Sequence, residues 1–184
     1  EKHNHLVLSK CQPEAFEFNS LSSIEILVHI PGLRKLKIPF SSKVEDLSLL
    51  GYMHDLEELD LSGCENVRDL APLTGLIKLQ HLNLAGCRGL MNIEPLAGLT
   101  ELKTLDISET QVSTLAPLSG LENLTNLRAA DCTELINLSP LQKLEKLQYL
   151  DASLSLPLAG NNEKNARHAN QKGKQGQEQK SDER

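Results

Sequence analysis

Hydrophobic and polar residues alternate over short segments that recur between residues 33 and 152. Each segment reads Leu-x-x-Leu-x-Leu, with Ile or Ala accepted at the last position, and the copies run 33–38, 56–61, 79–84, 102–107, 124–129 and 147–152. Their first leucines are 23, 23, 23, 22 and 23 residues apart. Alternation with a period of two is typical of a strand with one buried face. The pattern therefore predicts six short strands, each opening one unit of a repetitive fold.

The remainder of each unit also has a fixed pattern. An apolar residue, one variable residue, Pro and Leu follow in four units, at 70–73, 93–96, 115–118 and 138–141. Proline has a fixed φ and no N–H, so it suits the first turn of a helix. A unit of this length has no room for a regular crossover helix, and we predict short helical turns or extended segments opposite the strands.

The composition follows from this repetition. Leucine supplies 37 of the 184 residues, whereas aromatic residues make up 3% and Trp is absent. A compact core usually fills irregular gaps with side chains of several shapes. One unit cannot bury its own leucines, so neighbouring units must stack, and every level of the stack presents the same packing problem.

These residues resemble the leucine-rich repeat pattern, L-x-x-L-x-L-x-x-(N/C)-x-L, over about residues 33–156. The resemblance implies an α/β solenoid, a curved right-handed horseshoe with a parallel β-sheet on its concave face and short helical or extended convex segments. The Pro-containing segments resemble those of bacterial internalins and of protein-phosphatase regulatory subunits. Residues 59–64 and 82–87 are similar to trypanosomatid expression-site-associated repeat proteins, a group described as adenylate cyclase regulators.

We divide the chain into three parts. Residues 33–159 form the array of about six repeats. Residues 1–32 are an N-terminal cap or a degenerate repeat, in which Phe16 and Phe18 mark an irregular strand although the spacing fails there. Residues 160–184 contain no large aliphatic or aromatic side chain, and we predict a disordered polar tail.

The variable positions of the predicted strands form two columns on the concave face, which is the candidate partner-binding site. The first column contains Lys35, Glu58, His81, Thr104, Asn126 and Tyr149, and the second contains Lys37, Asp60, Asn83, Asp106, Arg128 and Asp151. The first strand is basic and the middle ones are mainly acidic. We expect a protein partner with a basic or mixed-charge segment. The alternative is that these residues only keep the sheet surface soluble.

A second set of positions, three residues after each strand segment, contains small polar or thiol side chains. They are Ser41, Cys64, Cys87, Thr110, Cys132 and Ser155. The cysteines could be metal ligands or a redox pair. Because Ser and Thr share the position, we favour a structural role, with each thiol pointing inward and donating to a backbone carbonyl.

The net charge and the absence of known motifs argue against several classes of function. A net charge of −6 and a pI near 5.5 argue against nucleic acid as a partner, and no apolar stretch is long enough to cross a membrane. Catalytic, phosphate-binding and zinc motifs are absent from the sequence. His81 beside Asp60 and Asp106 imitates a general base, but we expect no hydroxyl or thiol nucleophile to converge there.

We therefore expect a monomeric, non-catalytic protein-interaction module without metal or cofactor. Unpaired buried thiols favour an intracellular compartment. Two alternatives stay open. One is a regulatory or targeting subunit of an adenylate cyclase, phosphatase or ubiquitin ligase, and the other is a secreted, internalin-like adhesin.

Overall fold

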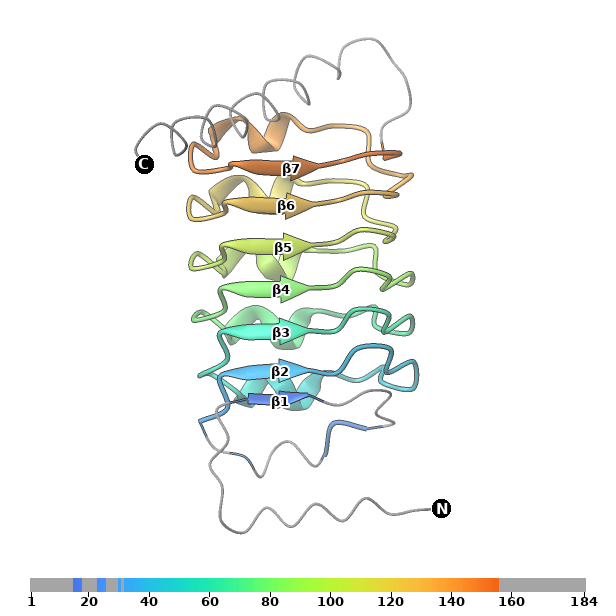
Figure 1. Ribbon diagram of the computed structural model, residues 1–184, viewed down its shortest axis with the longest axis vertical. Helices are drawn as coiled ribbons and strands as arrows, with labels where there is room; N and C mark the ends of the chain where they lie inside the picture. The colour runs from blue at the N-terminus through green and yellow to red at the C-terminus, as the bar shows by residue number, and fades with distance from the viewer. Residues whose placement is uncertain (1–14, 18–22, 26–29, 31, 156–184) are drawn as a thin grey trace, which may run out of the picture.

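The computed structural model describes residues 15–17, 23–25, 30 and 32–155. Seven short parallel strands form one sheet in chain order, from β1 to β7 (Figure 1). The strands are β1 (Ala15–Glu17), β2 (Lys35–Lys37), β3 (Glu58–Asp60), β4 (His81–Asn83), β5 (Thr104–Asp106), β6 (Asn126–Arg128) and β7 (Tyr149–Asp151). The predicted repeat solenoid with a parallel sheet is confirmed.

The register aligns equivalent positions of successive repeats. From β2 to β7, the central leucine of each strand pairs with the central leucine of the next, as Leu59 does with Leu82 and Leu82 with Leu105. Backbone hydrogen bonds between neighbouring repeats continue beyond the strand, since Leu61 N–H donates to the Asn83 carbonyl at 2.8 Å. The constant repeat length thus places like residues side by side.

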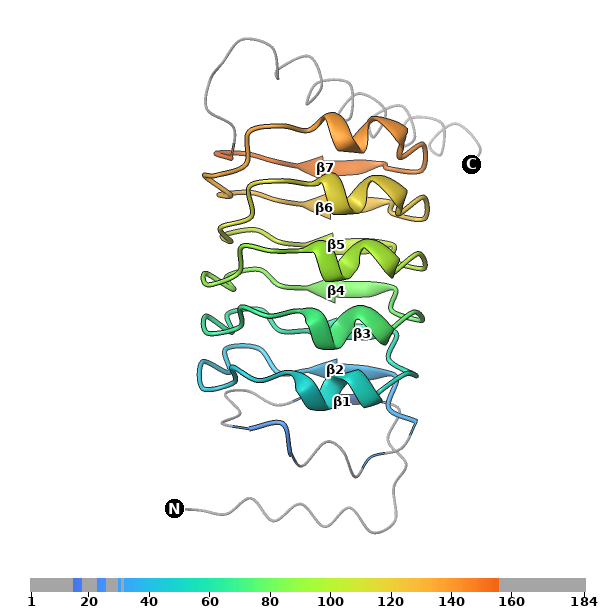
Figure 2. The ribbon, with the colours of Figure 1, turned by 180° about the vertical axis from the view of Figure 1, so that it is seen from behind.

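Among the described residues, the five 3-10 helices η2 to η6 lie on the side opposite the sheet (Figure 2). They are η2 (Ser48–Tyr52), η3 (Ala71–Gly75), η4 (Glu94–Gly98), η5 (Ala116–Gly120) and η6 (Ser139–Lys143). The predicted helical turns are confirmed, with Pro as the second residue of the last four helices. A 3-10 helix needs only five residues here, which a 22- or 23-residue repeat can accommodate.

The sequence analysis missed how these helices begin. A polar side chain two residues before each helix accepts a hydrogen bond from the first helical N–H, at 2.8 Å between Asp69 Oδ1 and Ala71 N. The equivalent acceptors are Asp46, Asn92, Thr114 and Asn137. Short polar side chains make such local bonds readily, so this column was present in the sequence as a repeated Asp, Asn or Thr.

The core lies between the sheet and the 3-10 helices. It consists of the repeated leucines with their Ile, Val and Ala substitutes, most of them fully buried, and it includes the thiol column. Full burial of one such aliphatic side chain contributes roughly 1.5–3 kcal/mol gross. Leu150 in β7 is only partly buried, which fits its place on the last strand that the structure describes.

Strand β1 shows where the periodicity failed. Phe16 pairs with Leu36, which is 20 residues further along the chain instead of 22 or 23. The segment before the array therefore adds a strand to the sheet despite its irregular spacing. Phe18 and residues 160–184 lie outside the described residues, and the boundaries at 32 and 159 stay predictions.

The turn that follows each of the strands β2 to β7 contains one residue in the left-handed region, at positions 40, 63, 86, 109, 131 and 154. Only two of the six are Gly; Phe40, Glu109 and Asp131 each have φ of 56°. In each of these three turns the N–H of this residue bonds a carbonyl of the next repeat, as Phe40 N does with Ser62 O at 2.7 Å. This inter-repeat bond holds a conformation that side chains normally avoid.

We predict that Gly63→Ala destabilises the fold by about 1–2 kcal/mol. Gly63 has φ of +70°, and an added Cβ would lie 2.5 Å from Cδ1 of Phe40. Gly98→Ala is the matched control, because its Cβ would meet nothing within 4 Å. Urea denaturation measures both variants, and an equal loss of stability in the two would contradict the prediction.

Candidate protein-binding face

The register places the twelve predicted site residues in two continuous columns across the sheet. In the first column Lys35 pairs with Glu58, Glu58 with His81, and so on to Tyr149. The second column runs in the same way from Lys37 to Asp151. Sequence reasoning thus identified which side chains are neighbours, whereas their role in binding stays a prediction.

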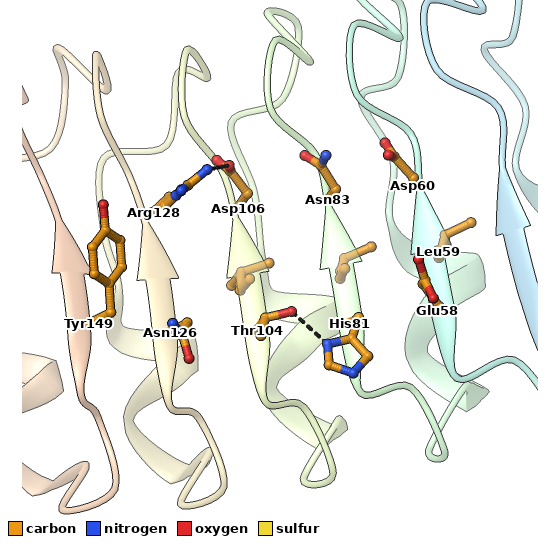
Figure 3. A pocket seen from close by; sticks show the side chains of 12 residues that line it. Glu58, Leu59, Asp60, His81, Asn83, Thr104, Asp106, Asn126, Arg128 and Tyr149 are labelled. Carbon is orange, nitrogen blue, oxygen red and sulfur yellow. Dashed lines mark hydrogen bonds and ion pairs between the residues drawn. The ribbon is translucent and has the colours of Figure 1, made fainter. Parts of the chain in front are cut away.

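A hollow of about 540 Å³ lies over strands β3 to β7 on this face (Figure 3). Buried Leu59, Leu82 and Leu105 form its floor. Nine of the twelve predicted residues line it: Glu58, Asp60, His81, Asn83, Thr104, Asp106, Asn126, Arg128 and Tyr149. Lys35, Lys37 and Asp151 are outside this lining.

At the β3 end of the hollow, the negative charge of Glu58 is balanced by two lysines of the neighbouring strand. Its carboxylate lies 2.9 Å from Lys37 Nζ and 3.4 Å from Lys35 Nζ. The hydrogen bond from Lys37 lowers the pKa of Glu58 below its ordinary value, and the same bond raises the pKa of Lys37. The predicted basic strand therefore compensates the first acidic one.

At the other end, Arg128 is held loosely. Its guanidinium Nη1 is 3.9 Å from Asp106 Oδ2, and its Cζ is 5.7 Å from the centre of the Tyr149 ring. The Tyr149 side chain stands beside Arg128 in Figure 3 and is 40% exposed. An arginine beside an exposed aromatic ring is a common combination at the centre of protein interfaces.

The second column has a structural task that sequence reasoning did not find. Oδ1 of Asp60 accepts a hydrogen bond from the N–H of Ser62 at 2.8 Å, which closes the turn after β3. Asn83, Asp106 and Asp151 bond the N–H two residues ahead in the same way. Asp and Asn side chains are suited to this local bond, so their repetition in this column has a reason besides binding.

The two basic residues of the column occur where this bond is unnecessary. Two residues after Lys37 comes Pro39, which has no N–H to satisfy. Two residues after Arg128, the N–H of Ala130 donates to Ser108 Oγ of the preceding repeat at 3.2 Å. Lys37 and Arg128 are therefore free of the turn-closing role.

The structure corrects one expectation about His81. Its Nδ1 lies 2.8 Å from Thr104 Oγ1, so a hydroxyl does converge on the ring, as the dashed line in Figure 3 shows. Activating a nucleophile also requires a third group to orient the base. Among the described residues no carboxylate hydrogen-bonds His81, and the pair lies in an open, polar hollow.

Residues 47–182, 136 of the 184, match a family model described as Zer-1-like leucine-rich repeats. The chain belongs to this leucine-rich repeat family. No curated protein matches its sequence.

Two solved structures from Listeria monocytogenes str. 4b F2365 are similar to this chain. Internalin C2 is 28% identical with a TM-score of 0.60, over 75% of this chain and 69% of its own. Internalin F is 25% identical with a TM-score of 0.64, over 77% of this chain, which spans only 48% of internalin F. These likenesses support the leucine-rich repeat fold; repeat domains of this kind typically bind proteins on an extended concave surface.

The thiol column has the structural role that was predicted. Cys64, Cys87 and Cys132 are buried, and each Sγ donates to a backbone carbonyl of the preceding repeat, at 3.0–3.3 Å. Burial raises the pKa of Cys87 to about 12 and also raises that of Cys64. Ser155 bonds the Ala129 carbonyl in the same way.

Among the residues that the structure describes, no group of three or more His, Cys, Asp or Glu side chains could hold a metal ion. No helix in that part of the chain is long and apolar enough to cross a membrane.

We predict that Asp106→Ala lowers the free energy of unfolding by about 1 kcal/mol, because the N–H of Ser108 loses its acceptor. Asp106→Asn retains an oxygen at the same place, as Asn83 does naturally, and should lose less. Urea denaturation at neutral pH distinguishes the two variants. Equal destabilisation would show that the charge matters and the turn-closing bond does not.

We also predict that the three described thiols are unreactive in the folded protein. A thiol reagent must reach the sulfur, which burial prevents for all three thiols, and it needs thiolate, which the raised pKa of Cys64 and of Cys87 also disfavours. The measurement uses a Cys11→Ser variant at pH 8, with and without urea, so that only Cys64, Cys87 and Cys132 remain. Rapid labelling without urea would contradict burial of the column.

Proposed function

We propose that the protein is a non-catalytic interaction module that binds a protein partner through the concave strand face. The observation that carries this proposal is the hollow over β3 to β7, whose rim of polar side chains is continuous across five strands. A single floor of buried leucines holds these side chains in a fixed order. A surface of this kind can contact an extended partner at several points at once.

Three side chains at the β7 end of the hollow close no turn, and they support the same conclusion. Arg128 closes no turn of its own, and Tyr149 exposes 40% of its surface although it lies on a sheet. Asn126 lines the hollow, and its oxygen accepts a hydrogen bond from Thr125 Oγ1, so its amide NH₂ group is the donor that it can offer to a partner. Tyr and Arg dominate binding energies in many interfaces, which makes this end of the hollow the preferred centre of contact.

The charge of the lining indicates the partner. The lining contains three carboxylates, those of Glu58, Asp60 and Asp106, and one guanidinium, that of Arg128. Of the three carboxylates, only Glu58 has its charge balanced by lysines. A partner segment that is basic or of mixed charge complements this lining better than an acidic one. A regulatory or targeting role in a larger enzyme complex would use the same face.

Photo-crosslinking tests the proposal. Benzoylphenylalanine replaces Asn126 inside the hollow, or Lys143 on the exposed surface of η6 as a control in the same repeat. We expect the same partner proteins to be captured repeatedly at position 126 and not at 143. Capture should decrease when Asp60→Asn and Asp106→Asn remove two charges while preserving the turn-closing oxygens.

Two results would contradict the proposal. One is equal capture of the same proteins at both positions, and the other is capture at position 126 that the Asn substitutions leave unchanged. A Glu101→Gln, Glu122→Gln variant is the control for charge, since both residues are exposed in the turns that precede strands.

A further inference from the structure

The carboxylates of the second column alternate with other side chains from strand to strand. Asp60 lies on β3, Asp106 on β5 and Asp151 on β7, whereas β4 and β6 carry Asn83 and Arg128. Neighbouring parallel strands are about 4.8 Å apart. The three carboxylates are therefore spaced at about 9.6 Å, over a total of about 19 Å.

Each of these carboxylates has a fixed orientation. One oxygen is bound to the N–H two residues ahead, at 2.8 Å for Asp60, 2.9 Å for Asp106 and 3.1 Å for Asp151. The turn-closing bond thus fixes the side chain, and the second oxygen of each is available to a ligand. In Asp106 that oxygen is only 3.9 Å from Arg128, a weak contact that a cation could replace.

The spacing selects the conformation of a bound peptide. In polyproline II every third side chain faces the same way, about 9.3 Å apart, which matches the interval of about 9.6 Å. An extended strand repeats its face about every 6.6 Å, and an α-helix about every 10.5 Å over two turns. The side chains of an extended strand or of an α-helix therefore do not stay aligned with three carboxylates that are about 9.6 Å apart.

The rest of the lining suits such a segment. Polyproline II leaves its backbone carbonyls without internal hydrogen bonds, and the amide NH₂ groups of Asn83 and Asn126 are donors in the hollow, because their oxygens are already used. Proline-rich segments also pack on aromatic side chains, and Tyr149 supplies one at the β7 end.

We infer that the concave hollow, together with Asp151 beside its β7 end, binds a basic peptide segment in the polyproline II conformation, with a cationic side chain at every third residue facing Asp60, Asp106 and Asp151. This inference rests on the proposed function, since it names the chemistry of the partner of that face. The segment crosses the strands, and its prolines pack toward Tyr149. Each ion pair is exposed and weak by itself, so the matched spacing gives the selectivity.

Three fluorescent peptides test the inference with the full chain. The first has three Arg-Pro-Pro triplets, the second has the same composition with its arginines contiguous, and the third has Glu in place of Arg. At about 50 mM salt, fluorescence anisotropy should show the triplet peptide binding at least about ten-fold more tightly than the contiguous one. The Glu peptide should not bind.

Matched variants locate the contact. Replacing Asp60, Asp106 and Asp151 by Asn preserves the turn-closing oxygens and should weaken triplet binding by about ten-fold or more. The control, Glu101→Gln, Glu122→Gln and Glu145→Gln, removes three exposed charges elsewhere and should change affinity less than two-fold. Thermal unfolding confirms that both variants fold.

The inference is overturned if the two arginine peptides bind equally, if the triplet peptide does not bind, or if both triple variants weaken it alike. The crosslinking experiment separates this result from a failure of the proposed function. Partners captured at position 126 without triplet binding would leave the binding face intact and reject only the peptide chemistry.

Discussion

The stacking of inward-facing leucines is the constraint on which the rest of this structure depends. No repeat can enclose its own apolar face, so each must lie directly on the next, with the central leucines of neighbouring strands in register. Backbone hydrogen bonds between repeats then follow the same alignment. Any residue type that recurs at one position becomes a column, and every column becomes a continuous feature of a surface or of the core.

The columns differ in what they contribute. The three buried thiols and Ser155 donate to backbone carbonyls of the preceding repeat. The Asp, Asn and Thr column before the 3-10 helices accepts hydrogen bonds from their first N–H groups. The second concave column combines two tasks, because its Asp and Asn side chains close turns while they face the hollow. The fold thereby fixes the orientation of groups that a partner would contact, which reduces the entropy lost on binding.

Much of the architecture could be predicted because every repeat buries the same leucine positions. The alternation of apolar and polar residues predicted the strands, the Pro-containing segments predicted the helical turns, and the constant repeat length predicted the two concave columns. Strand β1 was expected only as an irregular strand marked by Phe16, because Phe16 precedes Leu36 by 20 residues and does not fit the periodicity. The hydrogen bond between His81 and Thr104 was not predicted, because it depends on the rotamers of two side chains and a sequence pattern does not specify rotamers.

The sequence by itself determined the fold and the order of side chains on the concave face, because period, register and burial all follow from the positions of the leucines. Only the tertiary structure decided which of those side chains are engaged. It paired Glu58 with two lysines, assigned one oxygen of Asp60 and Asp106 to turns, and left Arg128 beside Tyr149. These outcomes depend on distances of a few ångströms between side chains of adjacent repeats, and a linear pattern does not contain such distances.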